Sequence, residues 1–256
     1  MPTDDNKLLN PPGWLQAIFF GVPDYNKAVE IVQNFVNLPP AVRVFAADNL
    51  LTWGRNLSFL DNPDLMAAVE KNAADQVDKA VLWRTAILYW AAKRTLRMPG
   101  EWAECGCYRG YSARVLCEAL KFNDHDKKFY LYDLFEHNED MNHHRMPDHS
   151  EELVDTVKAR FTDFPGVVVT KGSVPEVLAD VSPESISFLH IDMNNAAAEL
   201  GALEVLFDRV VAGGSIVFDD YGWAVYRAQK LAIDGFLAPR GYEVLELPTG
   251  QGLLIK

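Results

Sequence analysis

The sequence is poor in cysteine, and its few cysteines stand close together. Only three occur, at positions 105, 107 and 117. An odd, clustered count argues against a framework of disulfide bonds and is typical of a reducing compartment such as the cytoplasm. Cys105 and Cys107 lack the spacing of a zinc knuckle, and no second cysteine pair follows them. We therefore expect the three cysteines to be small packing residues.

Positive charge and long apolar runs are also scarce. The chain carries 24 lysines and arginines against 36 aspartates and glutamates, a formal net charge of −12. A surface this negative repels phosphate backbones, which argues against a nucleic-acid partner. No apolar run approaches the roughly 20 residues that span a bilayer, and the acidic start "MPTDDNKLLNPPGW" does not resemble a signal peptide. The sequence thus predicts a cytoplasmic protein with no membrane or nucleic-acid partner, which leaves small molecules as ligands.

The first 99 residues have mainly helical patterns. In "NKAVEIVQNFVNL" the apolar residues fall on one helix face before Pro39-Pro40 ends the pattern. The stretch 62–97 keeps helical spacing over one or two helices, and Pro99-Gly100 breaks it. We therefore predict a helical N-terminal extension over residues 1–99.

Short apolar runs alternate with helical segments from Glu101 to the C-terminus. The runs, in order, are "EWAECG", "KFYLYDLF", "GVVVTKG", "ISFLHID" and "GSIVFDD". Alternating strands and helices form a parallel sheet with helices on both faces, and the final "YEVLELPTGQGLLIK" is typical of a β-hairpin. For residues 100–256 we predict an α/β fold with a doubly wound, Rossmann-like sheet of about five parallel strands, closed by an antiparallel hairpin. This is the architecture of class I S-adenosylmethionine (SAM) methyltransferases.

The segment "ECGCYRGYSA" places a glycine turn at the carboxyl end of the first of these strands, where ligands of such sheets bind. Gly106 and Gly110 permit close approach of the backbone to a ligand. The helix that begins near Ser112 offers free N–H groups to a carboxylate. The motif is not the G-x-G-x-x-G of dinucleotide sites. A plain turn between a strand and a helix is the alternative interpretation.

Asp133 ends the second predicted strand, near the ~20-residue spacing at which an acidic residue binds ribose hydroxyls in nucleotide sites. Alone it could be a solvated carboxylate, but together with the glycine turn it favours a nucleoside ligand. Lys171-Gly172-Ser173 ends the third strand, where an adenine ring would lie. We predict that SAM is the cofactor and that it contacts Glu104, Gly106, Tyr108, Gly110, Ser112, Asp133, Gly172 and Ser173.

Two adjacent carboxylates, Asp219 and Asp220, follow the buried run "SIVF", and Asp192 ends the strand before it. Three carboxylates in one small volume repel unless they are protonated or share a cation. Oxygen ligands suit Mg²⁺, Ca²⁺ or Mn²⁺ better than zinc or copper. We predict a site for Mg²⁺ or Mn²⁺ held by these three aspartates. In the alternative, Asp220 caps a turn and only Asp219 faces the cleft.

Five motifs in order, "ECGCYRGYSA", "LYDLFE", "KGSVPEVL", "FLHIDMN" and "AGGSIVFDDYGW", together resemble the macrocin O-methyltransferase family over roughly residues 100–256. The resemblance implies SAM-dependent methylation of a hydroxyl on a sugar or other diol-bearing natural product. It also implies that Asp192, Asp219 and Asp220 bind Mg²⁺, that the metal holds hydroxyls of the acceptor, and that Asp192 is the general base. In that family the N-terminal region shapes the substrate pocket, so we expect residues 1–99 to contribute to it and to a homodimer.

The sequence departs from this family after the fourth strand. The family usually continues as Asp-x-Asp-x-Tyr-x-Ser-Thr, whereas this chain reads "DMNNAAAE", with Asn194 in place of the second aspartate. The three metal ligands are kept, but substrate contacts from this loop do not carry over. Residues 1–99 also match the family poorly, so the acceptor is not identified. Two other functions stay open, a SAM-binding protein without catalysis and a nucleotide-dependent oxidoreductase.

Histidines gather in the polar stretch 136–150, which contains His137, His143, His144 and His149. The stretch has little apolar surface to bury, so we expect a lid over the cleft rather than a metal cluster. One of its histidines could act as the base in place of Asp192. His190 lies two residues before Asp192 and, by strand alternation, on the same side of the strand. We expect it to be a buried, hydrogen-bonded histidine.

Overall fold

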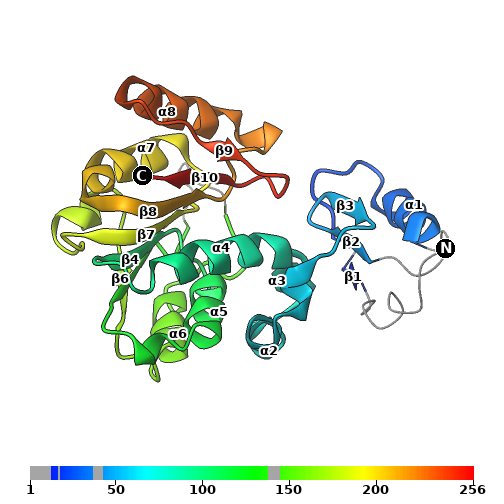
Figure 1. Cartoon of the computed structure of the whole chain (residues 1–256), viewed down its shortest axis with the longest axis horizontal. Coiled ribbons are helices and arrows are strands. Elements are labelled where there is room, and N and C mark those ends of the chain that lie inside the picture. The colour runs from blue at the N-terminus through cyan, green and yellow to red at the C-terminus, as the bar shows by residue number, and fades with distance from the viewer. Residues whose placement is uncertain (1–12, 17, 37–42, 138–144) are drawn as a thin grey trace. The chain divides into compact units, whose positions relative to one another are not determined.

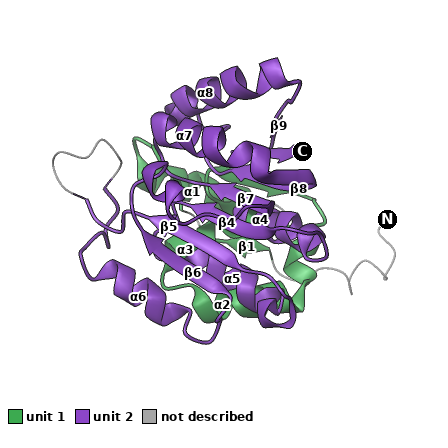
Figure 2. Ribbon diagram, turned by 90° about the vertical axis from the view of Figure 1, so that its left-hand side faces the viewer, with its two compact units in different colours: residues 1–83 green, residues 84–256 purple. Residues whose placement is uncertain are grey.

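The computed structural model describes residues 13–16, 18–36, 43–137 and 145–256. The chain divides into two compact units, residues 1–83 and 84–256, which have different colours in Figure 2. The sequence predicts this boundary later, at Pro99-Gly100. The difference comes from helix α4 (Leu82–Thr95), whose Arg94 donates hydrogen bonds of 2.8 Å to Gly213 O and Ser215 Oγ in the sheet of the second unit.

The first unit contains the predicted helices. Helix α1 (Tyr25–Val36) follows the first apolar pattern, and the proline pair expected to end it lies outside the described residues. The second helical stretch is divided into α2 (Pro63–Asn72), α3 (Gln76–Ala80) and α4, after a short 3₁₀ turn at Ser58–Asp61. Asn62 caps α2, since its Oδ1 accepts the N–H of Leu65 at 3.1 Å. Asp75 caps α3 in the same way.

The first unit also contains a three-stranded sheet, which the prediction of a mainly helical N-terminal region did not include. Its strands are β1 (Trp14–Leu15), β2 (Val44–Ala47) and β3 (Leu50–Trp53), in the order β1-β2-β3. Strands β2 and β3 form a hairpin in which Asp48 and Asn49 make the turn with φ of 52° and 56°. Aspartate and asparagine tolerate this left-handed conformation better than most residues, which makes Asp-Asn between two apolar runs a hairpin signal.

The second unit contains the predicted doubly wound sheet. Its seven strands have the order β6-β5-β4-β7-β8-β10-β9. The five strands from β6 at one edge to β8 are parallel, and the hairpin of β9 and β10 adds antiparallel strands beside β8. The fold class and the hairpin closure are therefore confirmed. The strand bounds are β4 Glu101–Cys105, β5 Phe129–Asp133, β6 Val167–Lys171, β7 Ile186–Ile191, β8 Val210–Phe218, β9 Leu245–Glu246 and β10 Gly252–Ile255.

Helices cover both faces of this sheet. Helices α7 (Ala196–Leu206) and α8 (Arg227–Leu237) lie on one side, and α4, α5 (Tyr111–Ala119) and α6 (Leu153–Arg160) lie on the other (Figure 1). Buried apolar side chains of α7 and α8 pack with those of β7 and β8 in one core. Rings of Trp102, Phe122, Phe129 and Phe188 pack together elsewhere in the unit. Among the described helices none is long and apolar enough to cross a membrane.

The strand register brings the predicted site residues to one edge. Glu104 of β4 pairs with His190 of β7, and His190 pairs with Val217 of β8. Asp192 follows β7, and its N–H donates to Cys105 O at 2.8 Å. Asp219 follows β8, and its N–H donates to Ile191 O at 3.0 Å. The carboxylates predicted to share a site thus leave neighbouring strands at the same carboxyl edge.

Candidate active site

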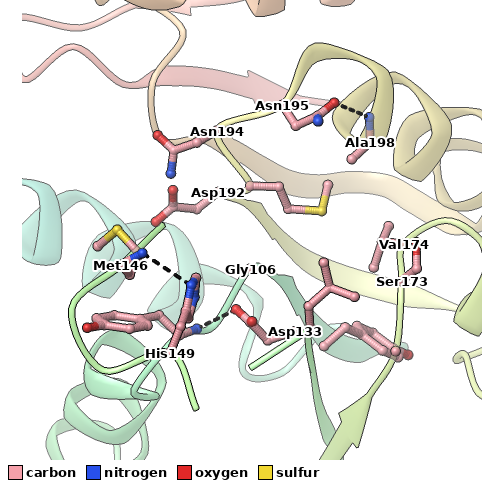
Figure 3. A pocket seen from close by; sticks show the side chains of 15 residues that line it. Gly106, Asp133, Met146, His149, Ser173, Val174, Asp192, Asn194, Asn195 and Ala198 are labelled. Atoms are coloured by element: carbon pink, nitrogen blue, oxygen red, sulfur yellow. Dashed lines mark hydrogen bonds between the residues drawn. The ribbon is translucent and has the colours of Figure 1, made fainter. Parts of the chain in front are cut away.

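A cavity of about 430 Å³ opens at this carboxyl edge of the sheet (Figure 3). Residues predicted from the sequence line it: Gly106, Tyr108, Asp133, Gly172, Ser173 and Asp192. The other lining residues are Tyr132, Leu134, Met146, His149, Val174, Met193, Asn194, Asn195 and Ala198. Ligands of doubly wound sheets bind at this edge, so the fold and the cavity indicate the same place.

Gly106 makes the tight turn at the base of the cavity. It has φ of 92°, a conformation that side chains disfavour. A Cβ atom on this residue would lie 1.7 Å from the carbonyl oxygen of Asp192, so only glycine lets the two loops approach. Gly110 serves a different purpose, because it is the N-cap of α5, with φ of 68°, and packs against Phe161. It is not among the residues that line the cavity.

Asp133 is held in place by the backbone around it. Its Oδ2 accepts the N–H of Tyr108 at 2.7 Å, and its Oδ1 accepts the N–H of Phe135 at 2.7 Å. Each carboxylate oxygen has two lone pairs, so one on each oxygen is left for a ligand. Because Asp133 lines the cavity, its carboxylate can accept two hydroxyl groups, as an adjacent pair of ribose hydroxyls would require.

Glu104 and Ser112, two further predicted cofactor contacts, are not among the residues that line the cavity. The Oγ of Ser112 donates to Glu104 Oε1 at 2.6 Å, and the same oxygen lies 2.8 Å from Nδ1 of His190. Glu104 is only 1% exposed. The two residues therefore orient His190 instead of facing a ligand in the cavity.

The loop "DMNNAAAE" has a structural explanation. Asn195 caps α7, since its Oδ1 accepts the N–H groups of Ala197 and Ala198 at 3.0 and 3.1 Å (Figure 3). Asn194 has φ of 54°, in the left-handed region that asparagine tolerates. Both residues line the cavity beside Asp192. The departure from the family motif thus keeps the loop ordered and changes the groups that it offers to a ligand.

Two of the three predicted metal ligands lie close together, with a histidine beside them. Atoms of His190, Asp192 and Asp219 that could bind a metal ion lie within 4.8 Å of one another. Asp220 is buried beside them but is not one of the three. His190 is buried and hydrogen-bonded to Glu104, as expected, yet its Nε2 has no hydrogen-bond partner and lies 3.7 Å from Asp219 Oδ1.

An arginine that the sequence did not reveal lies against the two adjacent aspartates. Nη1 of Arg84, at the start of α4, donates to Asp219 Oδ2 at 2.6 Å and lies 3.7 Å from Asp220 Oδ1. The guanidinium also lies 5.1 Å from the ring centre of Trp223. The other oxygen of Asp219 accepts a 2.8 Å hydrogen bond from Gln251. A positive side chain therefore compensates the two like charges that follow β8.

The cluster separates the pKa values of its members. Burial, followed by the charges of Asp219 and Asp220, raises the pKa of Asp192 well above its usual value. Burial also opposes ionisation of Asp219, but Arg84 and His190 outweigh it and lower the pKa of that carboxyl. Burial would lower the pKa of His190, yet its contact with Asp219 and its hydrogen bond to Glu104 raise it to about 10. Carboxyl groups with separated pKa values are typical of functional sites.

Glu199 of α7 is a further acidic residue near the cluster. It is 3% exposed, and its Oε1 accepts the N–H of Met193 at 3.3 Å and Nε2–H of Gln229 at 2.8 Å. Burial, which outweighs the hydrogen bond from Met193, raises the pKa of Glu199 to about 8. Its carboxyl group supports the backbone directly after Asp192.

Part of the predicted lid lies over the cavity. Met146 and His149 line it, and the N–H of Met146 donates to Nδ1 of His149 at 3.1 Å (Figure 3). The hydroxyl of Tyr108 donates to Asp148 at 2.9 Å, which joins this segment to the glycine turn. His143 and His144 lie outside the described residues, so opening and closing of the segment stays a prediction.

A comparison with protein families finds one match. Residues 103–221 match a family described as a methyltransferase domain. The matched range begins in β4 and ends just after Asp220, so it includes the glycine turn, Asp133 and the carboxylate cluster. No curated protein matches the chain.

Solved structures share the fold. The O-methyltransferase NovP aligns at TM-score 0.60 and 18% identity, over 72% of this chain and 83% of that chain. An SAH-bound methyltransferase of Podospora anserina, PaMTH1, aligns at 0.56 and 15%, over 91% and 97%. CalS11, described as a TDP-rhamnose 3'-O-methyltransferase, aligns at 0.55 and 15%, over 94% and 98%. Residues 103–221 thus resemble a methyltransferase domain in sequence, and the second unit shares the fold of these solved structures.

Proposed function

We propose that this chain is a SAM-dependent O-methyltransferase that acts on a hydroxyl of a small molecule. One observation carries the proposal: the glycine turn, a carboxylate with lone pairs left for two hydroxyls, and Asp192 of the acidic cluster line one cavity. Gly106 and Asp133 belong to the cofactor end of this cavity, and Asp192 belongs to the acceptor end. The methyltransferase domain match and the shared fold of O-methyltransferases support it.

The cofactor end is suited to the nucleoside of SAM. The ribose hydroxyls would donate to Asp133, whose side chain two backbone N–H groups already orient. The adenine would lie near Gly172 and Ser173. The Gly106 turn leaves room for the amino-acid portion. Prior orientation of these groups reduces the entropy that binding would otherwise cost. PaMTH1, which shares the fold, binds SAH, and this is consistent with SAM as the cofactor.

A divalent cation is compatible with the donors at the acceptor end. Mg²⁺ or Mn²⁺ would be held by Asp192 and Asp219, which lie close enough to share an ion, and by Asp220 beside them. Nε2 of buried His190 would be a further donor only after the imidazole releases the proton that its raised pKa retains. Bound there, the metal would lower the pKa of an acceptor hydroxyl and orient it.

Asp192 is the general base of the proposal. It lines the cavity beside Gly106 and can reach an acceptor that is held next to the cofactor. Met146 and Val174 add apolar walls that exclude water. Because the methyl group of a sulfonium is already activated, alignment of the hydroxyl with it supplies most of the acceleration.

The acceptor class follows from the resemblance to the macrocin O-methyltransferases and from the fold shared with CalS11. We propose a sugar hydroxyl, or another diol, of a natural product. The test incubates the protein with SAM and a panel of nucleotide sugars, glycosylated natural products and catechols, followed by mass spectrometry. A methylated product that disappears with EDTA and returns with Mg²⁺ supports the proposal in full. Methylation of none of these classes contradicts the acceptor, and methylation unaffected by EDTA contradicts the metal.

A further inference from the structure

We propose that Arg84 and the divalent cation exchange at the same carboxylates. Arg84 compensates Asp219 and Asp220 while the metal is absent, and its guanidinium leaves Asp219 when the metal binds. The inference rests on the proposed metal-dependent function, and it adds that Arg84 competes with the metal for the carboxylate of Asp219.

The contact between Arg84 and the carboxylates is close and poorly solvated. The side chains of Arg84, Asp219 and Asp220 are 13%, 10% and 8% exposed. Their separations of 2.6 and 3.7 Å place one positive charge against two negative ones. A carboxylate this far from water is costly without a cation, so the metal-free chain needs Arg84 where it lies.

A metal ion at this cluster would bind the carboxylate that Arg84 already contacts. Oδ2 of Asp219 accepts from Arg84, and Oδ1 accepts from Gln251. A small divalent cation binds a carboxylate oxygen at roughly 2.1 Å. A guanidinium within hydrogen-bond distance of the same carboxylate would then face two positive charges, and this repulsion is strong in a poorly solvated site. Simultaneous contact of Asp219 with the guanidinium and with the metal ion is therefore unfavourable.

The buried imidazole of His190 independently points to a ligand at this place. Glu104 holds Nδ1 at 2.8 Å, and Nε2 has no hydrogen-bond partner although the side chain is 3% exposed. Nε2 lies 3.7 Å from Asp219 Oδ1, too far for a good hydrogen bond. A histidine held by a carboxylate on one nitrogen, with the other nitrogen aimed at a cluster of acids, is a frequent arrangement in metal sites.

Helix α4 can keep its position when Arg84 lets go. Arg94, further along the helix, donates to Gly213 O and Ser215 Oγ at 2.8 Å, and Ser215 Oγ lies 3.3 Å from Ala91 O. These bonds attach α4 to β8 without the Arg84–Asp219 pair. The exchange therefore requires only a new conformation of the Arg84 side chain. The guanidinium can keep its contact with the ring of Trp223 when it leaves Asp219.

The test is a calorimetric titration of the full-length protein with MgCl₂ and MnCl₂. It compares the wild type with Arg84→Gln, which removes the charge, and with Arg84→Lys, which retains it. Lys93→Gln is the control, because it removes a positive charge of the same helix whose side chain contacts Tyr89 and not the aspartates. We expect Arg84→Gln to bind metal at least about tenfold more tightly than the wild type, and Arg84→Lys and Lys93→Gln to remain within about threefold of it.

Thermal unfolding provides a second readout. In EDTA, Arg84→Gln should melt below the wild type because its carboxylates are uncompensated, and saturating Mg²⁺ should raise its melting temperature more than that of the wild type. Equal or weaker metal binding by Arg84→Gln, or no metal binding by either protein, would overturn the inference. SAH is also titrated into the same samples, to distinguish failure of the exchange from failure of the proposed function. Cofactor binding without metal binding rejects the exchange but not SAM-dependent methyl transfer.

Discussion

The backbone N–H of Tyr108 lies 2.7 Å from Oδ2 of Asp133, and this bond joins the glycine turn after β4 to the end of β5. The two residues are 25 positions apart in the sequence. The contact fixes the carboxylate before any ligand arrives and leaves lone pairs for two hydroxyls. The nucleoside end of the cavity is therefore organised by the chain itself.

Replacement of Asp133 should weaken cofactor binding. Asp133→Asn keeps the size of the side chain but removes its charge and one acceptor oxygen. A hydrogen bond to a charged group is worth roughly 1.5–3 kcal/mol, so the dissociation constant for SAH should rise by about 10- to 100-fold. Calorimetry measures this, with Asp155→Asn on the exposed side of α6 as control. Unchanged affinity in Asp133→Asn would remove this carboxylate from the site.

A side chain at Gly106 should disrupt the same end of the cavity. In Gly106→Ala the new Cβ would lie 1.7 Å from the carbonyl oxygen of Asp192, at a φ of 92°. We expect a loss of at least about 2 kcal/mol in the free energy of unfolding, together with loss of SAH binding. Urea unfolding and calorimetry measure the two effects.

Gly235→Ala is the matched control, because a Cβ at this position of α8 meets nothing within 4 Å. It should be neutral or stabilise by about 0.5–1 kcal/mol, as expected for alanine in a helix. Similar behaviour of the two variants would show that the turn at Gly106 tolerates a side chain.

Asp192→Asn should separate catalysis from cofactor binding. The variant keeps the size of the side chain and cannot accept the proton of a hydroxyl. Loss of a general base typically lowers kcat by about 10²–10⁴-fold, while SAH affinity should stay within a few-fold because the ribose and adenine contacts lie elsewhere. Single-turnover rates with an acceptor from the panel provide the measurement. A rate near that of the wild type would shift the base to another residue, and His149 of the lid would be the next to test.

Glu199 predicts a pH dependence of stability. Its pKa is raised from 4.5 to about 8 in the folded chain, so the folded state holds a proton that the unfolded state has lost between these values. The stabilisation is fully present below pH 4.5 and is lost as the pH rises to about 8, at a slope near 1.4 kcal/mol per pH unit.

Glu199→Gln removes this titration and keeps an oxygen acceptor for Met193 and Gln229. The variant should therefore gain stability relative to the wild type as the pH rises from 5 to 8, and the difference should level off above pH 8. Melting temperatures of the wild type and Glu199→Gln between pH 5 and pH 8 provide the measurement. A constant difference between the two proteins would mean that Glu199 is ionised throughout.

The sheet and its site edge were predictable from the sequence because they depend on local signals. Apolar runs that end in Asp133, Asp192 and Asp219 define strands and the polar ends of strands at once. The hairpin at Asp48-Asn49 carried an equally local signal, an Asp-Asn pair between apolar runs, that the helical interpretation of residues 1–99 passed over.

Arg84 and Gln251 could not be placed in the same way. They lie 135 and 32 positions from Asp219, and only tertiary packing brings them to it. Nor could sequence patterns show that Ser112 donates to Glu104, which in turn holds His190, so that neither Ser112 nor Glu104 lines the cavity. Spacing in the sequence identified which residues gather at the edge, but not which of them bind one another.

The most direct test of the central claim is a calorimetric titration of the wild-type protein with SAH, compared with NAD⁺ under the same conditions. The account predicts saturable binding of SAH with one site per chain, lost in Gly106→Ala, and no binding of NAD⁺, because the turn lacks the G-x-G-x-x-G pattern of dinucleotide sites. Binding of NAD⁺ without binding of SAH would contradict the account and assign the cavity to a nucleotide-dependent oxidoreductase.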